Sequence, residues 1–280
     1  MERRPFGKNG ELVPVIGQGT WRMEGDERAL AIRALRAGLE EGMMHIDTAE
    51  MYGSGEVEET VREAIAGRRD EVFLVSKVWP QNATYEGTIA ACDRSLSRLG
   101  TDRLDCYLLH WPGHHPLEET IRAFETLVRA GKIRSWGLSN FDAPRLEKAF
   151  AIAGEGRIAC DQVLYNVGER SIEQAVLPWC EQHGVAVVAY SPLGSGVFPS
   201  PRSAGGRALL EIAAAHEATP HQVALAFVLR RPAVLTIPKA SRPEHAVEDA
   251  RAAGLRLSLE ELRRLEAVFP LRVKRELPMI

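Results

Sequence analysis

Short apolar runs recur eight times along this chain, and a loop and a helical pattern follow each of them. Runs that are apolar at nearly every position are typical of strands buried on both faces of a parallel sheet. Eight such units, with no Gly-x-Gly-x-x-Gly after the first, favour a closed barrel over a doubly wound sheet. The runs lie at residues 13–17, 43–47, 72–77, 104–110, 133–138, 158–162, 185–190 and 234–239. We therefore predict the α/β class and a (β/α)8 TIM barrel.

Helical patterns rich in alanine, leucine and charged residues separate the runs. They lie at residues 27–41, 57–66, 85–98, 117–130, 143–153, 174–183, 220–230 and 243–253. Two extra helices, at 207–217 and 259–269, fall outside the alternation. The Asn9-Gly10 pair within residues 6–12 predicts an N-terminal β-hairpin. Because the Gly/Pro/Ser-rich segment 194–206 is too short to link domains, we predict a single barrel domain over residues 1–280.

The composition is that of an ordinary globular protein, with 45% hydrophobic and 26% charged residues. A net charge of −3 and a pI of about 6.3 give no basic field that would favour nucleic acid. No apolar run approaches bilayer length, and the first residues lack the apolar segment of a signal peptide. The four cysteines form no Cys-x-x-Cys pair, which indicates reduced thiols. We expect a cytoplasmic protein with no membrane partner that is, by default, a monomer.

The candidate chemistry lies where the strands end, because the carboxyl ends of barrel strands converge on one mouth. Asp47 ends the second run, Tyr52 follows it on a loop, Lys77 ends the third run and His110 the fourth. A buried ammonium costs several kcal/mol unless a carboxylate meets it, so we expect Asp47 to pair with Lys77. The pair is also consistent with a purely structural role, in which it holds two neighbouring strands in register.

The same residues suggest proton transfer to a carbonyl oxygen. A tyrosine with a pKa of about 10 is a poor proton donor at pH 7, and a neighbouring cation lowers that pKa. We expect Lys77 to lower the pKa of Tyr52 and His110 to hydrogen-bond a substrate oxygen. No serine or cysteine stands out beside a base, so we expect the group that attacks carbon to be a hydride from a nicotinamide cofactor.

A metal-dependent barrel hydrolase is the first alternative. His45 and Asp47 share one strand end, and His110, His114 and His115 cluster near another. On a strand, however, His45 would lie one layer deeper than Asp47, and Lys77 would put a cation in the metal cavity. We therefore predict no metal site.

The chain resembles the aldo-keto reductases from the hairpin to about Leu271. Together, and in this order at these strand ends, the motifs are highly specific. They are most similar to those of a bacterial branch with compact loops, some of whose members reduce methylglyoxal and related aldehydes. The motifs are Gly17-Gln18-Gly19-Thr20-Trp21, His45-Ile46-Asp47-Thr48-Ala49, Tyr52-Gly53, Val75-Ser76-Lys77, Leu109-His110-Trp111, Gly137-Leu138-Ser139-Asn140-Phe141, residues 162–166, Tyr190-Ser191-Pro192-Leu193-Gly194 and Ile237-Pro238-Lys239.

The resemblance implies NADPH-dependent reduction of small aldehydes or ketones to alcohols, with NADH as a weaker alternative. It assigns Asp47, Tyr52, Lys77 and His110 to a catalytic tetrad in which Tyr52 is the general acid. Within the cofactor set, the carboxamide would be held by Ser139, Asn140 and Gln162. Tyr190 would stack on the nicotinamide ring. The adenosine ribose and its 2′-phosphate would meet Lys239, Ser241, Arg242 and His245. The implied cofactor residues are Thr20, Trp21, Asp47, Ser139, Asn140, Gln162, Tyr190, Ser191, Pro192, Leu193, Gly194, Ile237, Lys239, Ala240, Ser241, Arg242, His245 and Asp249. The implied substrate residues are Trp21, Tyr52, Trp79, His110 and Trp111, although the three tryptophans could also simply pack at a barrel rim.

Three features depart from the family pattern. His245 stands where many NADPH-preferring members carry arginine, and a neutral histidine weakens phosphate binding above about pH 6.5. The loop 194–201 is short, and the tail 271–280 lacks the long substrate-gripping segment of the animal enzymes. We therefore expect an incomplete NADPH preference and an open pocket with broad aldehyde specificity. A second alternative, a nicotinamide-binding regulatory subunit with slow turnover, stays open although all four tetrad residues are present.

Overall fold

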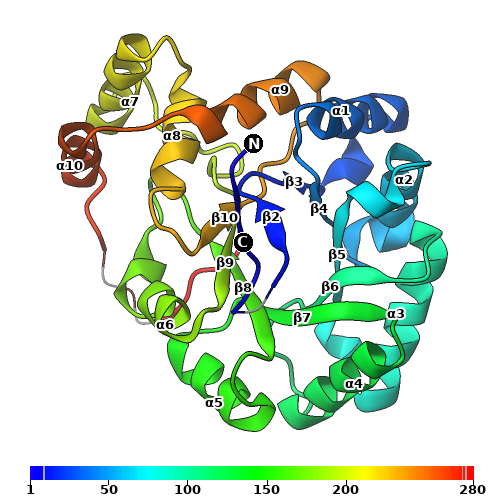
Figure 1. Cartoon of the computed structure of the whole chain (residues 1–280). Coiled ribbons are helices and arrows are strands. Elements are labelled where there is room, and N and C mark those ends of the chain that lie inside the picture. The colour runs from blue at the N-terminus through cyan, green and yellow to red at the C-terminus, as the bar shows by residue number, and fades with distance from the viewer. Residues whose placement is uncertain (9, 273, 275) are drawn as a thin grey trace.

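The central feature of the computed structural model, which describes residues 1–8, 10–272, 274 and 276–280, is a curled sheet of eight parallel strands (Figure 1). Strands β3 to β10 pair in chain order. The sheet closes on itself, because Gly17 donates its N–H to the Thr236 carbonyl at 2.8 Å and Gly19 donates to the Pro238 carbonyl at 3.0 Å. The strands are β3 (Gln18–Gly19), β4 (His45–Asp47), β5 (Phe73–Val78), β6 (Leu104–Leu109), β7 (Ile133–Ser139), β8 (Ile158–Leu164), β9 (Ala186–Tyr190) and β10 (Val234–Thr236). The predicted (β/α)8 barrel is confirmed.

Helices surround the barrel and lie within one turn of the predicted ranges (Figure 1). They are α1 (Arg28–Glu40), α2 (Glu56–Ala64), α3 (Tyr85–Leu99), α4 (Leu117–Arg129), α5 (Ala143–Ala153), α6 (Val176–His183), α7 (Ala204–Ala215), α8 (Pro220–Val228), α9 (Pro243–Arg251) and α10 (Leu259–Val268). The two extra helices, α7 and α10, pack with α8 through a separate apolar cluster that includes Leu209, Phe227 and Leu265. Among the described residues, no helix has the length and apolar character needed to cross a bilayer.

The prediction of the first barrel strand was wrong, because β3 (Gln18–Gly19) lies wholly after the predicted range 13–17. Val13 belongs instead to β2 (Leu12–Pro14), which pairs antiparallel with β1 (Arg3–Pro5). Pairing with β1 takes the backbone groups that a barrel strand would need, and Pro14 has no N–H to donate. The N-terminal hairpin is confirmed, but its strands flank the predicted segment 6–12 instead of filling it. Asn9, half of the predicted Asn-Gly turn, lies outside the described residues.

The alternation of side chains along each strand sorts the barrel interior into layers. On β5, Phe73, Val75 and Lys77 are the alternate residues that face inward, and the first two belong to an apolar cluster inside the barrel. Phe6 and Val13 of the hairpin segment join this cluster and cover its lower end. Lys77 is therefore the last inward-facing residue of its strand, directly above an apolar plug.

All four cysteines are buried and free, as the sequence predicted for reduced thiols. Cys106 and Cys160 lie in the interior cluster of the barrel, and Cys92 and Cys180 lie in the outer core between sheet and helices. Burial raises the pKa of each of Cys92, Cys160 and Cys180, so these thiols stay protonated at neutral pH.

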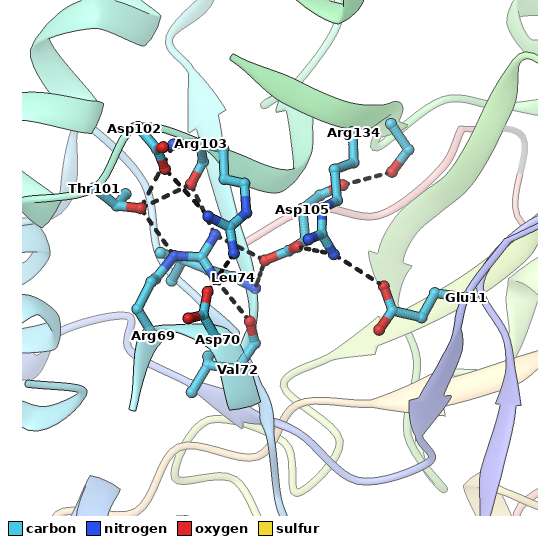
Figure 2. A network of polar contacts seen from close by, with 11 residues as sticks. Glu11, Arg69, Asp70, Val72, Leu74, Thr101, Asp102, Arg103, Asp105 and Arg134 are labelled. Atoms are coloured by element: carbon cyan, nitrogen blue, oxygen red, sulfur yellow. Dashed lines mark hydrogen bonds and ion pairs between the residues drawn. The ribbon is translucent and has the colours of Figure 1, made fainter. Parts of the chain in front are cut away.

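A polar network ties the hairpin to the amino-terminal ends of the strands, opposite the mouth (Figure 2). The buried carboxylate of Asp105 accepts the Leu74 backbone N–H at 2.9 Å and pairs with Arg69 at 2.9 Å. Its other oxygen pairs with Arg134 at 3.1 Å, and Arg134 reaches Glu11 beside the hairpin at 3.4 Å. Asp105 thus links β5, β6, β7 and the hairpin through one side chain.

We predict that Asp105→Ala lowers the free energy of unfolding by about 2–3 kcal/mol, because it leaves a buried N–H without its acceptor and removes the buried carboxylate that Arg69 and Arg134 share. Denaturant unfolding of the variant measures this loss. Asp102→Ala is the matched control, since Asp102 is exposed and its ion pair with Arg103 is at the surface. A loss for Asp105→Ala no larger than for Asp102→Ala would show that the network does not stabilise the fold.

Candidate active site

A cavity of about 640 Å³ opens at the carboxyl ends of the barrel strands. Fifteen of the site residues predicted from the sequence line it, namely Thr20, Trp21, Asp47, Tyr52, His110, Trp111, Ser139, Asn140, Gln162, Tyr190, Ser191, Pro192, Leu193, Ile237 and Lys239. They come from loops and strands spread over most of the chain. The mouth of the barrel therefore brings most of the predicted residues into one site.

Lys77 is the fully buried hub of the four predicted catalytic residues. Its ammonium donates to Asp47 Oδ1 at 2.5 Å, to the Thr48 carbonyl at 2.8 Å and to the Tyr52 hydroxyl at 3.3 Å. The expected pairing of neighbouring strand ends is thus present, since Asp47 ends β4 and Lys77 lies on β5. Tyr52 is held in place because residues 52–55 form a short 3-10 turn, with the Tyr52 N–H donating to the Ala49 carbonyl at 3.1 Å.

Burial controls the protonation of this group. Desolvation raises the pKa of the Tyr52 phenol above its ordinary value, and Lys77 opposes the rise without reversing it. Lys77 lowers the pKa of Tyr52 as expected, but removal of the phenol from water outweighs this effect, so the pKa stays above its ordinary value. Burial would lower the pKa of Lys77, but Asp47 and Tyr52 together raise it, so the ammonium stays charged. Tyr52 therefore keeps its proton at neutral pH beside a permanent cation.

His110 completes the group from the end of β6. Its ring lies edge-on to the Tyr52 ring, with 5.6 Å between centroids, and packs against Trp111 at 4.9 Å. Burial and the charge of Lys77 hold the pKa of His110 well below 6.5. A neutral imidazole offers one donor and one acceptor nitrogen, so His110 can hydrogen-bond an uncharged ligand oxygen.

A second set of contacts spans the mouth from β8 to β4. Gln162 donates its amide to Asp47 Oδ2 at 2.7 Å, so both oxygens of the Asp47 carboxylate are engaged. Asn140 has a left-handed backbone with φ +62°, which asparagine tolerates better than most residues. Its side chain donates to the His110 carbonyl at 3.2 Å and accepts from the Tyr190 hydroxyl at 2.9 Å. These three amide and phenol groups hold the strand ends at fixed positions around the cavity.

Several predicted residues do not line the cavity. Trp79 lies outside the lining, and the carboxylate of Glu50 holds its backbone N–H at 2.8 Å. Lys239 lines the cavity, but its ammonium contacts Asp26 Oδ2 and Ser241 Oγ, each at 2.6 Å. The predicted residues that stand outside the lining are Lys77, beneath the site, and Trp79, Gly194, Ala240, Ser241, Arg242, His245 and Asp249.

Asp249 is buried on α9 instead of facing the cavity. Burial, with a smaller contribution from the neighbouring charge of Glu248, raises the pKa of Asp249 to about 8. Its carboxyl group is therefore largely neutral at physiological pH.

Sequence reasoning missed other lining residues, including Arg22, Met51, Ser195, Met279 and Ile280. The last two matter most, because the brief tail was expected to leave the pocket open. The tail instead returns to the mouth, and in Figure 1 the C-terminus projects onto the centre of the barrel. Local sequence gave no signal for this return, because the tail contacts residues far away in the chain. Gln174, for example, donates its side-chain amide to the Arg272 carbonyl at 3.1 Å.

No group of three or more His, Cys, Asp or Glu side chains that could hold a metal occurs within the described part of the chain. His45 lies one layer below Asp47, between the rings of Phe6 and Phe73, with centroids at 5.8 and 5.5 Å. Both of its ring nitrogens are buried without a hydrogen-bond partner among the described residues. Burial and Lys77 lower the pKa of His45 to about 3. His45 is thus a neutral core residue instead of part of a metal site.

Fold and site together define a (β/α)8-barrel enzyme whose polar residues converge at the carboxyl ends of the strands. The chain belongs to the aldo/keto reductase family, whose family profile matches residues 15–269. It is therefore an oxidoreductase of that family.

Two curated relatives illustrate the branch. The chain is 43% identical over 273 residues to methylglyoxal reductase YeaE of Escherichia coli K12, covering 96% of each protein. It is 34% identical over 261 residues to glyoxal reductase of Bacillus subtilis, covering 93% of this chain and 90% of the relative.

Two solved structures from Klebsiella pneumoniae are similar over 100% of both chains. One is an aldo/keto reductase in complex with NADP and acetate, at 44% identity and a TM-score of 0.93. The other is an aldo-keto reductase in complex with NADPH, at 43% identity and a TM-score of 0.93. Likeness at this level extends to the whole barrel and its loops.

We predict that His45 makes folding stability fall on acidification. The unfolded imidazole binds a proton below about pH 6.5 and the folded one only near pH 3, so the unfolded state gains protons first. Between pH 5.5 and 4 this difference costs about 1.4 kcal/mol per pH unit, a slope that His45→Leu removes.

Unfolding free energies measured across this pH range test the prediction. His114→Leu is the control, because His114 is exposed and its replacement should leave the slope as it is in the unmodified protein. Equal slopes for all three proteins would mean that His45 does not stay neutral in the folded state.

Proposed function

We propose that this protein reduces small aldehydes and ketones to alcohols with NADPH, and that methylglyoxal-like dicarbonyls are among its substrates. One observation carries the proposal: a charged lysine, buried with its carboxylate partner, contacts a protonated tyrosine that lines the cavity. A carbonyl oxygen that becomes an alkoxide needs a proton and a neighbouring positive field. Tyr52 and Lys77 supply these two things.

The cavity residues fit a nicotinamide coenzyme by their chemistry. Ser139, Asn140 and Gln162 present a hydroxyl and two amides, which match the donors and acceptors of a carboxamide. Tyr190 offers an aromatic face, and Lys239 a cation for a phosphate. When bound, NADPH supplies the hydride for the carbonyl carbon. NADH is the weaker alternative, because only NADPH carries the additional phosphate.

Gln162 keeps hydrogen-bonding capacity beyond its bond to Asp47. Its amide nitrogen donates one N–H to Asp47 Oδ2, which leaves a second N–H and the amide oxygen to pair with a carboxamide. Asp47 also has Lys77 as its counterion. The tetrad can therefore retain its charge balance and its bond to Gln162 when the coenzyme enters.

The residues act on the substrate in one step. Tyr52 donates its phenolic proton to the substrate oxygen, and the Lys77 ammonium stabilises the phenolate that remains. Neutral His110 orients the same oxygen by a hydrogen bond, without competing as an acid. Asp47 keeps Lys77 charged in the dry interior.

Apolar side chains form part of the cavity wall beside the candidate catalytic residues. Trp21 and Trp111 line the cavity, and Met279 and Ile280 of the tail add further apolar surface. Methylglyoxal and glyoxal, named for two relatives, are small aldehydes of this kind.

The test is NADPH titration by tryptophan fluorescence, combined with NADPH oxidation in the presence of methylglyoxal or 4-nitrobenzaldehyde. Tight binding with substrate-dependent oxidation is the expected result. Tight binding without turnover would favour the regulatory alternative. No binding would overturn the assignment of the coenzyme.

We predict that Tyr52→Phe lowers kcat by about 100-fold or more and leaves the Kd of NADPH nearly unchanged, because the ring keeps its packing and loses its proton. Steady-state kinetics and fluorescence titration measure the two quantities. Tyr85→Phe is the matched control, since the Tyr85 hydroxyl hydrogen-bonds Thr126 on the helical surface and Tyr85 does not line the cavity. A Tyr52→Phe variant with near-normal kcat would exclude Tyr52 as the proton donor.

A further inference from the structure

The one lysine predicted to meet the coenzyme phosphate is paired with a carboxylate. Lys239 Nζ lies 2.6 Å from Asp26 Oδ2 and 2.6 Å from Ser241 Oγ. The side chains of Lys239 and Asp26 are 25% and 18% exposed, so the pair is only partly screened by water. An incoming phosphate therefore meets a cation whose charge is already balanced.

The pair joins two loops at the seam where the barrel closes. Asp26 follows the short 3-10 turn η1 (Met23–Gly25), and its N–H donates to the Met23 carbonyl at 3.0 Å. Lys239 follows β10, and Gly19 of β3 donates to the Pro238 carbonyl next to it. The fold itself thus brings the two side chains together.

Arg242, the other predicted phosphate ligand, is in a different state. It is exposed at the start of α9, and no ion pair of its side chain is found in the described parts of the chain. Among the described residues of the predicted phosphate region, Arg242 therefore has no ion pair, and Lys239 is neutralised by Asp26.

We propose that Asp26 competes with the coenzyme's 2′-phosphate for Lys239 and so limits the preference for NADPH over NADH. This inference rests on the proposed function. NADH has no 2′-phosphate, so it leaves the Asp26–Lys239 pair undisturbed. NADPH gains Lys239 only by drawing it away from Asp26, and the lost ion pair offsets part of the gain.

The experiment measures the Kd of NADPH and of NADH by fluorescence titration for the unmodified protein and for Asp26→Asn. The variant should bind NADPH about two- to fivefold more tightly and NADH equally well. The gain should shrink at high salt, because the competing interaction is electrostatic and partly exposed. Thermal unfolding of each protein checks that the variant is folded.

Two further variants isolate the pair. Glu27→Gln removes the same charge from the next, exposed residue and should produce a smaller change in selectivity. In a Lys239→Met background, Asp26→Asn should no longer alter the ratio of the two Kd values, because the group in competition is absent.

The opposing results are distinct. Weaker binding of both coenzymes by Asp26→Asn would mean that the pair closes over the coenzyme. Equal effects of Asp26→Asn and Glu27→Gln would mean that only the overall negative charge near the site matters. Either of these two results overturns the inference. Failure of the unmodified protein to bind either coenzyme would instead overturn the proposed function, and the inference with it.

Discussion

The buried ion pair between Asp47 and Lys77 is the interaction on which the site depends. An ammonium with no exposure to water is tolerable only if its donors are all used, and Lys77 contacts Asp47, the Thr48 carbonyl and the Tyr52 hydroxyl. These contacts couple β4, β5 and the following loop. The position and the protonation of Tyr52 both follow from the location of that one lysine.

The amino-terminal end of the barrel stabilises the fold, and the carboxyl end holds the candidate catalytic residues. At the amino-terminal end, Phe6 and Val13 cover an apolar interior, and Asp105 ties three strands to the hairpin. At the carboxyl end, Asn140 holds a left-handed backbone, and His110 is kept neutral by burial and a nearby cation. Features of this kind cost stability, and a rigid lower barrel can support them.

Lys239, at the side of the mouth where the coenzyme phosphate is proposed to bind, has two candidate partners. Lys239 has the character of a phosphate ligand, but its ammonium is also the counterion of Asp26. The proposed competition is therefore a reason, separate from the position of His245, to expect an incomplete preference for NADPH over NADH.

Local patterns in the sequence were enough to predict seven of the eight strands, the number and order of all eight, the extra helices and the grouping of Asp47, Tyr52, Lys77 and His110 at one mouth. This was possible because strand alternation and the convergence of strand ends are set by backbone geometry. The early start predicted for the first strand failed because the hairpin competes for Val13. The tertiary structure alone decided the raised pKa of Tyr52, the bond from Gln162 to Asp47, the pairing of Asp26 with Lys239 and the return of Met279 and Ile280 to the cavity. Each of these four features depends on the exclusion of water or on contact between residues far apart in the chain. A local sequence pattern encodes neither burial nor long-range contact.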